Sequence, residues 1–199
     1  MAQFAPDAAG ELDQRVPLST ALEESPDISL YDHLKTTAAI GCCISEYLRC
    51  TGETDFKSRL FEQEKQFREE PAFLLYSADL SGIQRFIYTV ADDGALRALR
   101  SRSFFLGLLM EHYVDEILEG CGLSRANLLY SGGGHCYVLL PNTAAVADTL
   151  TRWNRQFNRW LQQQFGTQLF LANAWTPCSG NDLTNTPAEK APTKSCSAG

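Results

Sequence analysis

The sequence lacks the features of a disulfide-stabilised, zinc-binding or membrane-spanning protein. Its 7 cysteines are odd in number and no two of them have C-x-x-C spacing, so neither a disulfide framework nor a zinc ribbon is predicted. No apolar run approaches the ~18 residues of a membrane span. Residues 1–10 contain no basic segment followed by an apolar core, as a secretory signal would. We therefore expect reduced thiols, a cytoplasmic location and no membrane contact.

Basic residues are also scarce. Lys and Arg number 17 against 24 Asp and Glu, which makes the formal net charge −7. This balance argues against a general nucleic-acid coat but leaves a local basic patch open. The hydrophobic share of 44% and the charged share of 21% are those of an ordinary folded protein, and 199 residues suit one domain with an appendage.

The character of the chain changes three times along its length. Residues 1–26 are rich in proline and read as a linker or truncated edge. Residues 27–70 are predicted to be a helix capped by Ser29 followed by a helical connector. Residues 72–176 carry the strongest periodic signals, and residues 177–199 are predicted to be disordered or a truncated tail.

Within residues 72–176 the predicted order is strand, helix, strand, strand, helix, strand. The expected strands are 73–79, 126–131, 135–140 and 168–175, and the expected helical stretches are 83–90, 95–119 and 142–165. This β-α-β-β-α-β order is that of the ferredoxin-like fold, an α+β arrangement. The sequence therefore predicts a palm-like domain preceded by a helical segment.

A ferredoxin-like sheet would bring Asp79 beside the turn formed by Gly132, Gly133, Gly134 and His135, because its first and third strands are antiparallel neighbours. Polymerase palms and nucleotide cyclases build two-metal sites at this place, and two Mg²⁺ ions need several carboxylates. Asp79 is thus a candidate metal ligand. His135 is a poor one, since magnesium prefers hard oxygen donors.

The segment after Asp79 is a candidate phosphate cradle. Leu80, Ser81 and Gly82 join a strand to a helix start, where backbone N–H groups and the helix dipole favour an anion. For this segment by itself, a tight turn with an N-cap serine is the simpler explanation. Combined with the glycine triplet 132–134, the segment becomes a candidate nucleotide site.

Two further groups of residues invite a functional interpretation. Arg97, Arg100 and Arg102 cluster at the start of the long helix, either as a solvated face or as contacts to phosphate or nucleic-acid backbone. Asp32 and His33 lie near the start of the first helix, but none of the 3 histidines precedes an aspartate. A complete His-Asp phosphohydrolase site therefore cannot be written from this chain.

Four long strings in the sequence point to one family. They are DISLYDHLKTTAAI (27–40), LLYSADLSGIQRFIYTV (74–90), ALRALRSRSFFLGLLMEHYVDEIL (95–118) and NLLYSGGGHCYVLLPNT (127–143). Together they resemble the large signature subunit of type III-A CRISPR effector complexes, the Csm-type Cas-ten family, over roughly residues 15–180.

The resemblance implies a multidomain parent with an HD nuclease for single-stranded DNA, two palm domains, a zinc-binding insertion and a C-terminal helical domain. This chain resembles the end of the HD domain, in which Asp32 and His33 would be remnants, followed by the first palm. The family converts ATP to cyclic oligoadenylates with Mg²⁺ or Mn²⁺, and its Gly-Gly-Asp-Asp motif belongs to the second palm.

The resemblance also implies partners. They are the second palm and the HD domain of the parent chain, the other type III-A effector subunits and, indirectly, CRISPR RNA and target RNA. The expected function is that of an ATP-binding, non-catalytic first palm in antiviral defence. The alternative is a structural module that links the HD domain, the second palm and the RNA-bound subunits.

Overall fold

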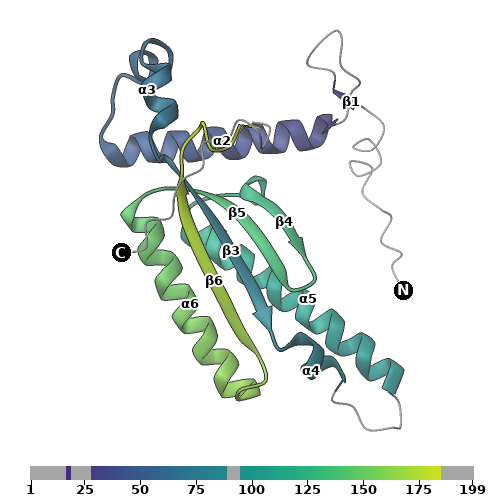
Figure 1. Cartoon of the computed structure of the whole chain (residues 1–199). Coiled ribbons are helices and arrows are strands. Elements are labelled where there is room, and N and C mark those ends of the chain that lie inside the picture. Colours follow the sequence, from purple (N-terminus) through teal and green to yellow (C-terminus); the bar gives the residue numbers. More distant parts are fainter. Residues whose placement is uncertain (1–16, 19–27, 89–94, 185–199) are drawn as a thin grey trace, which may run out of the picture.

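A computed structural model describes residues 17–18, 28–88 and 95–184 of the chain (Figure 1). A two-residue strand, β1 (Pro17–Leu18), pairs with β2 (Ile28–Ser29) ahead of the long helix α2 (Leu30–Thr51). A short π-helix, η1 (Ser58–Glu62), and α3 (Glu64–Glu69) follow. The remaining elements form the main domain: β3 (Phe73–Ser81), α4 (Ile83–Tyr88), α5 (Ala95–Gly120), the 3₁₀ turn η2 (Arg125–Asn127), β4 (Leu128–Gly132), β5 (His135–Pro141), α6 (Ala144–Phe165) and β6 (Phe170–Cys178).

The four long strands form one antiparallel sheet in the order β4-β5-β3-β6. This is the predicted ferredoxin-like topology, in which the first strand of the domain, β3, lies at the centre between the third and the fourth. In the register, Phe73 pairs with Pro141 and Asp79 pairs with His135. The predicted neighbourhood of Asp79 and the glycine turn is therefore confirmed.

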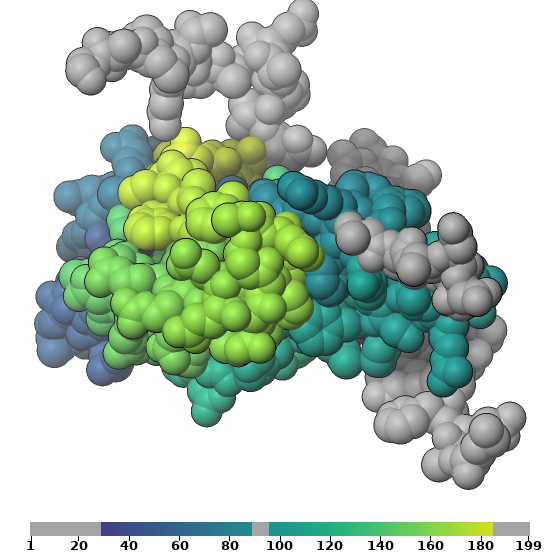
Figure 2. Space-filling model, turned by 90° about the horizontal axis from the view of Figure 1, so that it is seen from below, coloured from purple at the N-terminus to yellow at the C-terminus, as the bar shows by residue number. Residues whose placement is uncertain are grey.

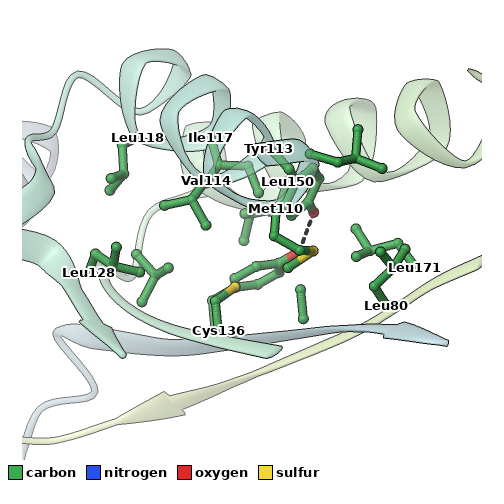
Figure 3. Close-up of a cluster of buried hydrophobic side chains, with 14 of the residues drawn as sticks. Leu80, Met110, Tyr113, Val114, Ile117, Leu118, Leu128, Cys136, Leu150 and Leu171 are labelled. Atoms are coloured by element: carbon green, nitrogen blue, oxygen red, sulfur yellow. Dashed lines mark hydrogen bonds between the residues drawn. The ribbon is translucent and has the colours of Figure 1, made fainter. Parts of the chain in front are cut away.

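Both long helices, α5 and α6, cover the same face of this sheet, as Figure 3 shows with the helices on one side and the strands on the other. Alternate side chains of β3 and β5 point into the layer between them and meet apolar residues of the helices. The fully buried members of this core include Leu74, Leu80, Val114, Ile117, Cys136, Val138, Leu140, Leu150, Leu161 and Leu171.

A polar group lies inside this apolar layer. The hydroxyls of Tyr76 on β3 and Tyr113 on α5 lie within hydrogen-bond reach of each other, and both donate to Oδ1 of Asn154 on α6. Burial raises the pKa of both tyrosines above the ordinary value, so the hydroxyls stay neutral donors. One carboxamide oxygen thus connects the sheet to both helices.

Helix α2 covers part of the opposite face, near the start of β3 (Figure 1). A second core joins Ala39 and Cys43 of α2 to Phe73 and Leu139 of the sheet. The buried carboxamide of Asn127 donates to the carbonyl of Leu139, at 2.9 Å, and to the sulfur of Cys43, at 3.3 Å. The helical segment is therefore packed onto the sheet and not merely tethered to it.

Strand β3 is covered by helices on both faces at its start but on only one face farther along, and its residues differ accordingly. At its start Phe73, Leu74 and Leu75 are consecutively apolar, because helices lie on both faces there. Farther along, buried and open positions alternate, and the open positions hold polar Ser77 and Asp79. Half of the second face is therefore left uncovered.

Several boundaries differ from the sequence predictions. The central strand continues two residues beyond Asp79 because Leu80 and Ser81 still pair with β6. The connector expected as one helix is split into η1 and α3. Residues 177–184 are ordered, since β6 ends at Cys178 and the Asn181 N–H donates to the Arg68 carbonyl. Residues 185–199, and all of 1–26 but Pro17 and Leu18, lie outside the described residues.

None of the helices in the described ranges is long and apolar enough to span a membrane.

Candidate nucleotide site

The uncovered half of the sheet carries the candidate site. Ser77, Asp79 and Ser81 occupy alternate positions of β3, so their side chains share the face opposite α5 and α6, beyond the part that α2 covers. His135 and Tyr137 on β5 are the register partners of Asp79 and Ser77 and continue this face across the neighbouring strand. The hairpin turn and the start of α4 border it in Figure 1.

The imidazole of His135 lies between two side chains of β3. Its Nδ1 is 3.4 Å from Oδ1 of Asp79, and its Nε2 is 3.3 Å from Oγ of Ser77. Its ring meets the ring of Tyr137 edge to face with centroids 4.7 Å apart. The ring orientation is thereby fixed by contacts on three sides, while Asp79 keeps 52% of its side-chain surface exposed.

The order serine, histidine, aspartate is that of a hydrolase triad, but this surface does not support acyl transfer. Ser77 lies in the middle of a central strand, where it pairs with Tyr137 on one side and Ala174 on the other. Its neighbouring backbone amides point into the two ladders, so they cannot serve as oxyanion donors.

Three glycines shape the rim of the site. Gly82 has φ +92°, and a Cβ there would lie 1.9 Å from the carbonyl oxygen of Gln168. Gly134, with φ +88°, accepts a hydrogen bond from the Leu80 N–H at 2.8 Å, and a Cβ there would meet Ile83. Gly133, with φ +62°, has nothing within 4 Å of where a Cβ would lie. The first two are required for packing, whereas Gly133 presents bare backbone to open space.

The turn is held in place from behind. Ser131 donates to Glu111 of α5 at 2.8 Å, and Arg125 donates to the same carboxylate. These hydrogen bonds hold the pKa of Glu111 below its usual value, with the Ser131 contact the larger cause. Strand β4 is therefore anchored to α5 by a group that stays ionised at neutral pH.

The other predicted site residues do not all reach the open face. The Leu80 side chain is buried in the core, so Leu80 shapes the turn and offers no side chain to a ligand. The guanidinium of Arg102 donates to the Phe86 carbonyl at 2.6 Å and lies over the Phe86 ring, tying α5 to α4. Arg97 and Arg100 are exposed at the start of α5.

Asp32 and His33 lie on α2, which crosses the end of the sheet opposite the glycine turn (Figure 1). The N–H of Asp32 donates to Oγ of the N-cap Ser29, and that hydroxyl donates to the Asp32 carboxylate. In this structure, Asp32 stabilises a helix start. His33 is exposed.

The donor set around Asp79 does not fit a two-ion metal centre. Among the described residues, no group of three or more His, Cys, Asp or Glu side chains is placed to hold a metal ion. The imidazole of His135, 3.4 Å from Asp79, is a ligand that Mg²⁺ disfavours. No chemical step through a metal follows from this arrangement.

Sequence reasoning missed three side chains of this face: Ser77, Tyr130 and Tyr137. Tyr130 and Tyr137 are exposed, with ring centroids 6.4 Å apart. The period-two alternation of β3 and β5 would have placed Ser77 and Tyr137 beside Asp79 and His135. Tyr130 was hidden by the β-bulge in β4, which shifts the register between Leu128 and Tyr130.

A four-stranded antiparallel sheet in this order, with both long helices on one face, defines the chain as a palm-like α+β domain. The family model described as "Csm1 subunit domain B" matches residues 72–197. The chain belongs to this family, the Csm1 subunit of subtype III-A CRISPR systems.

Curated relatives carry the same name. The single-strand-specific deoxyribonuclease Cas10/Csm1 of Mycobacterium tuberculosis is 52% identical over 176 residues, which are 88% of this chain and 22% of the relative. The corresponding protein of Thermococcus onnurineus is 38% identical and is matched over 83% of this chain and 20% of its own length. The chain thus spans about a fifth of these proteins.

Solved structures that resemble this chain also contain Csm1. A Csm1–Csm4 cassette in complex with pppApA has a TM-score of 0.71 at 35% identity, covering 82% of this chain and 22% of the other. A Csm1–Csm4 cassette in complex with one ATP has a TM-score of 0.66 at 37% identity, covering 79% of this chain and 20% of the other.

Proposed function

We propose that this chain is the first palm domain, with the adjoining end of an HD domain, of a Cas10/Csm1 protein that acts in antiviral defence. In this proposal the palm binds ATP on the uncovered half of its sheet and performs no chemistry itself. The parent would cleave single-stranded DNA through its HD domain and make cyclic oligoadenylates between its two palms.

The observation that carries the proposal is the pairing of Asp79 with His135 beside a glycine turn whose backbone is open. Gly133 has free space around it, so a nucleotide can approach the main chain closely. The exposed rings of Tyr130 and Tyr137 supply a flat apolar surface for a base next to that turn. Related cassettes in complex with ATP and with pppApA support a nucleotide on this domain.

The roles assigned to the residues follow from position. The backbone of Gly132–Gly134 would lie against the nucleotide, and the Ser81 hydroxyl and the amides after Gly82 would face its phosphates. Asp79 and Ser77 face the two ring nitrogens of His135, so the imidazole would contact the nucleotide through the face of its ring. Mg²⁺ or Mn²⁺ would be held by the second palm, because no metal-binding group of His, Cys, Asp or Glu side chains forms around Asp79 among the residues that the structure describes.

A structural linking module is the second candidate, and α2 favours it. Asn127 and the second core fasten the helical segment to the palm through buried contacts. Such a joint would transmit the position of the HD domain to the palm. The Csm1–Csm4 cassettes also support assembly with other type III-A subunits.

Titration of the 199-residue chain with ATP by isothermal calorimetry separates the two candidates. Saturable binding supports the nucleotide site, and its absence leaves the linking module. The variant Gly133→Val should abolish the binding, because it fills open space and forces a β-branched residue to φ +62°.

Gly122→Val is the matched control. Gly122 has φ +68° and also has nothing within 4 Å of a Cβ, so it carries the same backbone strain away from the site. In an assembled complex, Gly133→Val should reduce cyclic oligoadenylate synthesis while DNA cleavage persists. Equal synthesis in the two variants would refute the nucleotide role.

A further inference from the structure

The outer face of α6 carries an uncompensated basic stripe. Arg152, Arg155 and Arg159 follow one another at intervals of three and four residues, so they share one helix face. All three are exposed, and within the described ranges none of them makes an ion pair or a side-chain hydrogen bond. In a chain of net charge −7, three aligned free guanidinium groups are unexpected.

The stripe lies between two surface hollows. A hollow of about 650 Å³ is lined by Asp148, Thr151, Arg152, Arg155, Gln156 and Arg159. A second, of about 520 Å³, is lined by Arg155, Asn158, Arg159, Gln162, Gly166, Thr167, Leu169 and Phe170. Arg155 and Arg159 belong to both, so the hollows form one continuous basic surface with Asp148 as its single acidic group. In Figure 2, the surface of α6 runs directly into that of β6.

Exposed aromatic side chains flank the stripe. Phe170 is 56% exposed and lines the second hollow. Trp160 is 37% exposed and lines an apolar groove of about 510 Å³ between α5 and α6, which adjoins the first hollow through Gln156. If the arginines served only to keep this helix face in contact with water, exposed aromatic rings on both sides of them would have no purpose.

We infer that this face of α6 binds single-stranded nucleic acid. The arginines suit phosphate groups, because each guanidinium donates in a planar fork. Arg152 to Arg159 span roughly 10 Å at about 1.5 Å per residue, so each guanidinium can contact a different phosphate of one strand. The flanking rings can stack on unpaired bases, which a duplex keeps inside. This surface lies on the helix layer, so the inference is independent of the proposed ATP site on the sheet.

An acidic protein surface would satisfy the arginines equally well, but it would not use the exposed rings. Single-stranded nucleic acid offers both an anionic backbone and flat bases. The combination of a basic groove with aromatic side chains beside it therefore favours the nucleic acid.

Fluorescence anisotropy tests the inference with the 199-residue chain and labelled oligo(dT) and oligo(U) of about 16 nucleotides. We expect saturable binding of at least one of them, with log K falling against log salt at a slope of about −2 for three phosphate contacts. The variant Arg152→Gln/Arg155→Gln/Arg159→Gln should bind at least about tenfold more weakly with a flatter slope.

A charge-matched control comes from the connector. Lys57→Gln/Lys65→Gln/Arg68→Gln also removes three positive charges, but from exposed positions far from α6 in the sequence. This variant should bind the oligonucleotides within about twofold of the unmodified chain. Trp160→Leu should weaken binding about fivefold or more while preserving the salt slope. Thermal melts of each variant establish that the fold is retained.

Three results would overturn the inference: no saturable binding of either oligonucleotide, equal losses in the arginine variant and its connector control, or tighter binding of poly-glutamate than of both oligonucleotides. If a duplex of the same length bound as tightly as the single strand, the rings would not be stacking on unpaired bases, and the inference of single-strand binding would be wrong.

Discussion

Asp79 lies directly opposite His135 in the β3–β5 ladder, with 3.4 Å between Oδ1 of the aspartate and Nδ1 of the imidazole. The carboxylate and the imidazole are far apart in sequence and meet only because the first and third strands of the domain are neighbours. In polymerase palms and nucleotide cyclases, the carboxylates that bind two metal ions occupy this position in the sheet. Within the described ranges, no third His, Cys, Asp or Glu side chain joins the pair to hold a metal ion.

Asp79→Asn should leave ATP affinity unchanged or tighten it by up to about 1 kcal/mol, with Mg²⁺ or with EDTA. The reason is that an exposed carboxylate repels phosphate, and no second carboxylate of the described chain accompanies it to hold a metal. Calorimetry in both buffers measures the effect. A selective loss of Mg²⁺-dependent binding would assign a metal to Asp79. His135→Ala should weaken ATP binding by about 0.5–1.5 kcal/mol, the size of one aromatic contact.

Gly82→Ala should destabilise the domain by about 2 kcal/mol or more. The new methyl group would lie 1.9 Å from the carbonyl oxygen of Gln168, which belongs to the backbone and cannot rotate away. Gly133→Ala has a similar positive φ but free space, so we expect a loss of only about 1 kcal/mol. Urea unfolding of the two variants measures the difference. Equal losses would mean that the turn relaxes away from the α6–β6 connection.

Asn154→Leu should lower the unfolding free energy by about 1–3 kcal/mol, because it leaves buried tyrosine hydroxyls with fewer partners. Tyr76→Phe and Tyr113→Phe should each cost about 1 kcal/mol. The combination Tyr76→Phe/Tyr113→Phe/Asn154→Leu should recover part of the loss, since no polar atom of the group then remains buried. Strict additivity in the mutant cycle would contradict a shared network.

Stability should fall as pH rises above 9. Burial raises the pKa of the Cys43 thiol from its ordinary 9.0 to about 12, and those of Cys121 and Cys136 to about 11. Above pH 9 the unfolded chain releases these protons while the folded chain keeps them, so each thiol costs about 1.4 kcal/mol per pH unit up to its folded pKa. Urea titrations at pH 7, 9.5 and 10.5 measure the slope. Cys43→Ala should flatten it.

Local signals were sufficient to predict most of the fold. The Ser29 cap, the long amphipathic helices and the glycine hairpin are decided by nearby residues, and the structure contains each of them. The end of β3 was placed too early because Ser81 and Gly82 are typical of a turn. Pairing of Leu80 and Ser81 with β6 overrode that preference.

The polar contacts that lock the layers together could not be predicted. Asn127 is predicted to be part of the strand 126–131, with no signal that its side chain would be buried, yet it lies in the turn η2 and is fully buried between α2 and β5. Tyr76 and Asn154 are 78 positions apart, and periodicity alone marks both simply as core positions. Such contacts depend on where distant helices dock, which one helix or strand does not encode.

The shared carboxamide oxygen of Asn154 also has a mechanical consequence. A helix can slide along a purely apolar layer by exchanging one set of methyl groups for another, but a hydroxyl that leaves this oxygen finds no replacement inside the core. Helices α5 and α6 are therefore held at one setting relative to β3. A displacement of either helix against the sheet would therefore have to break hydrogen bonds to this one oxygen.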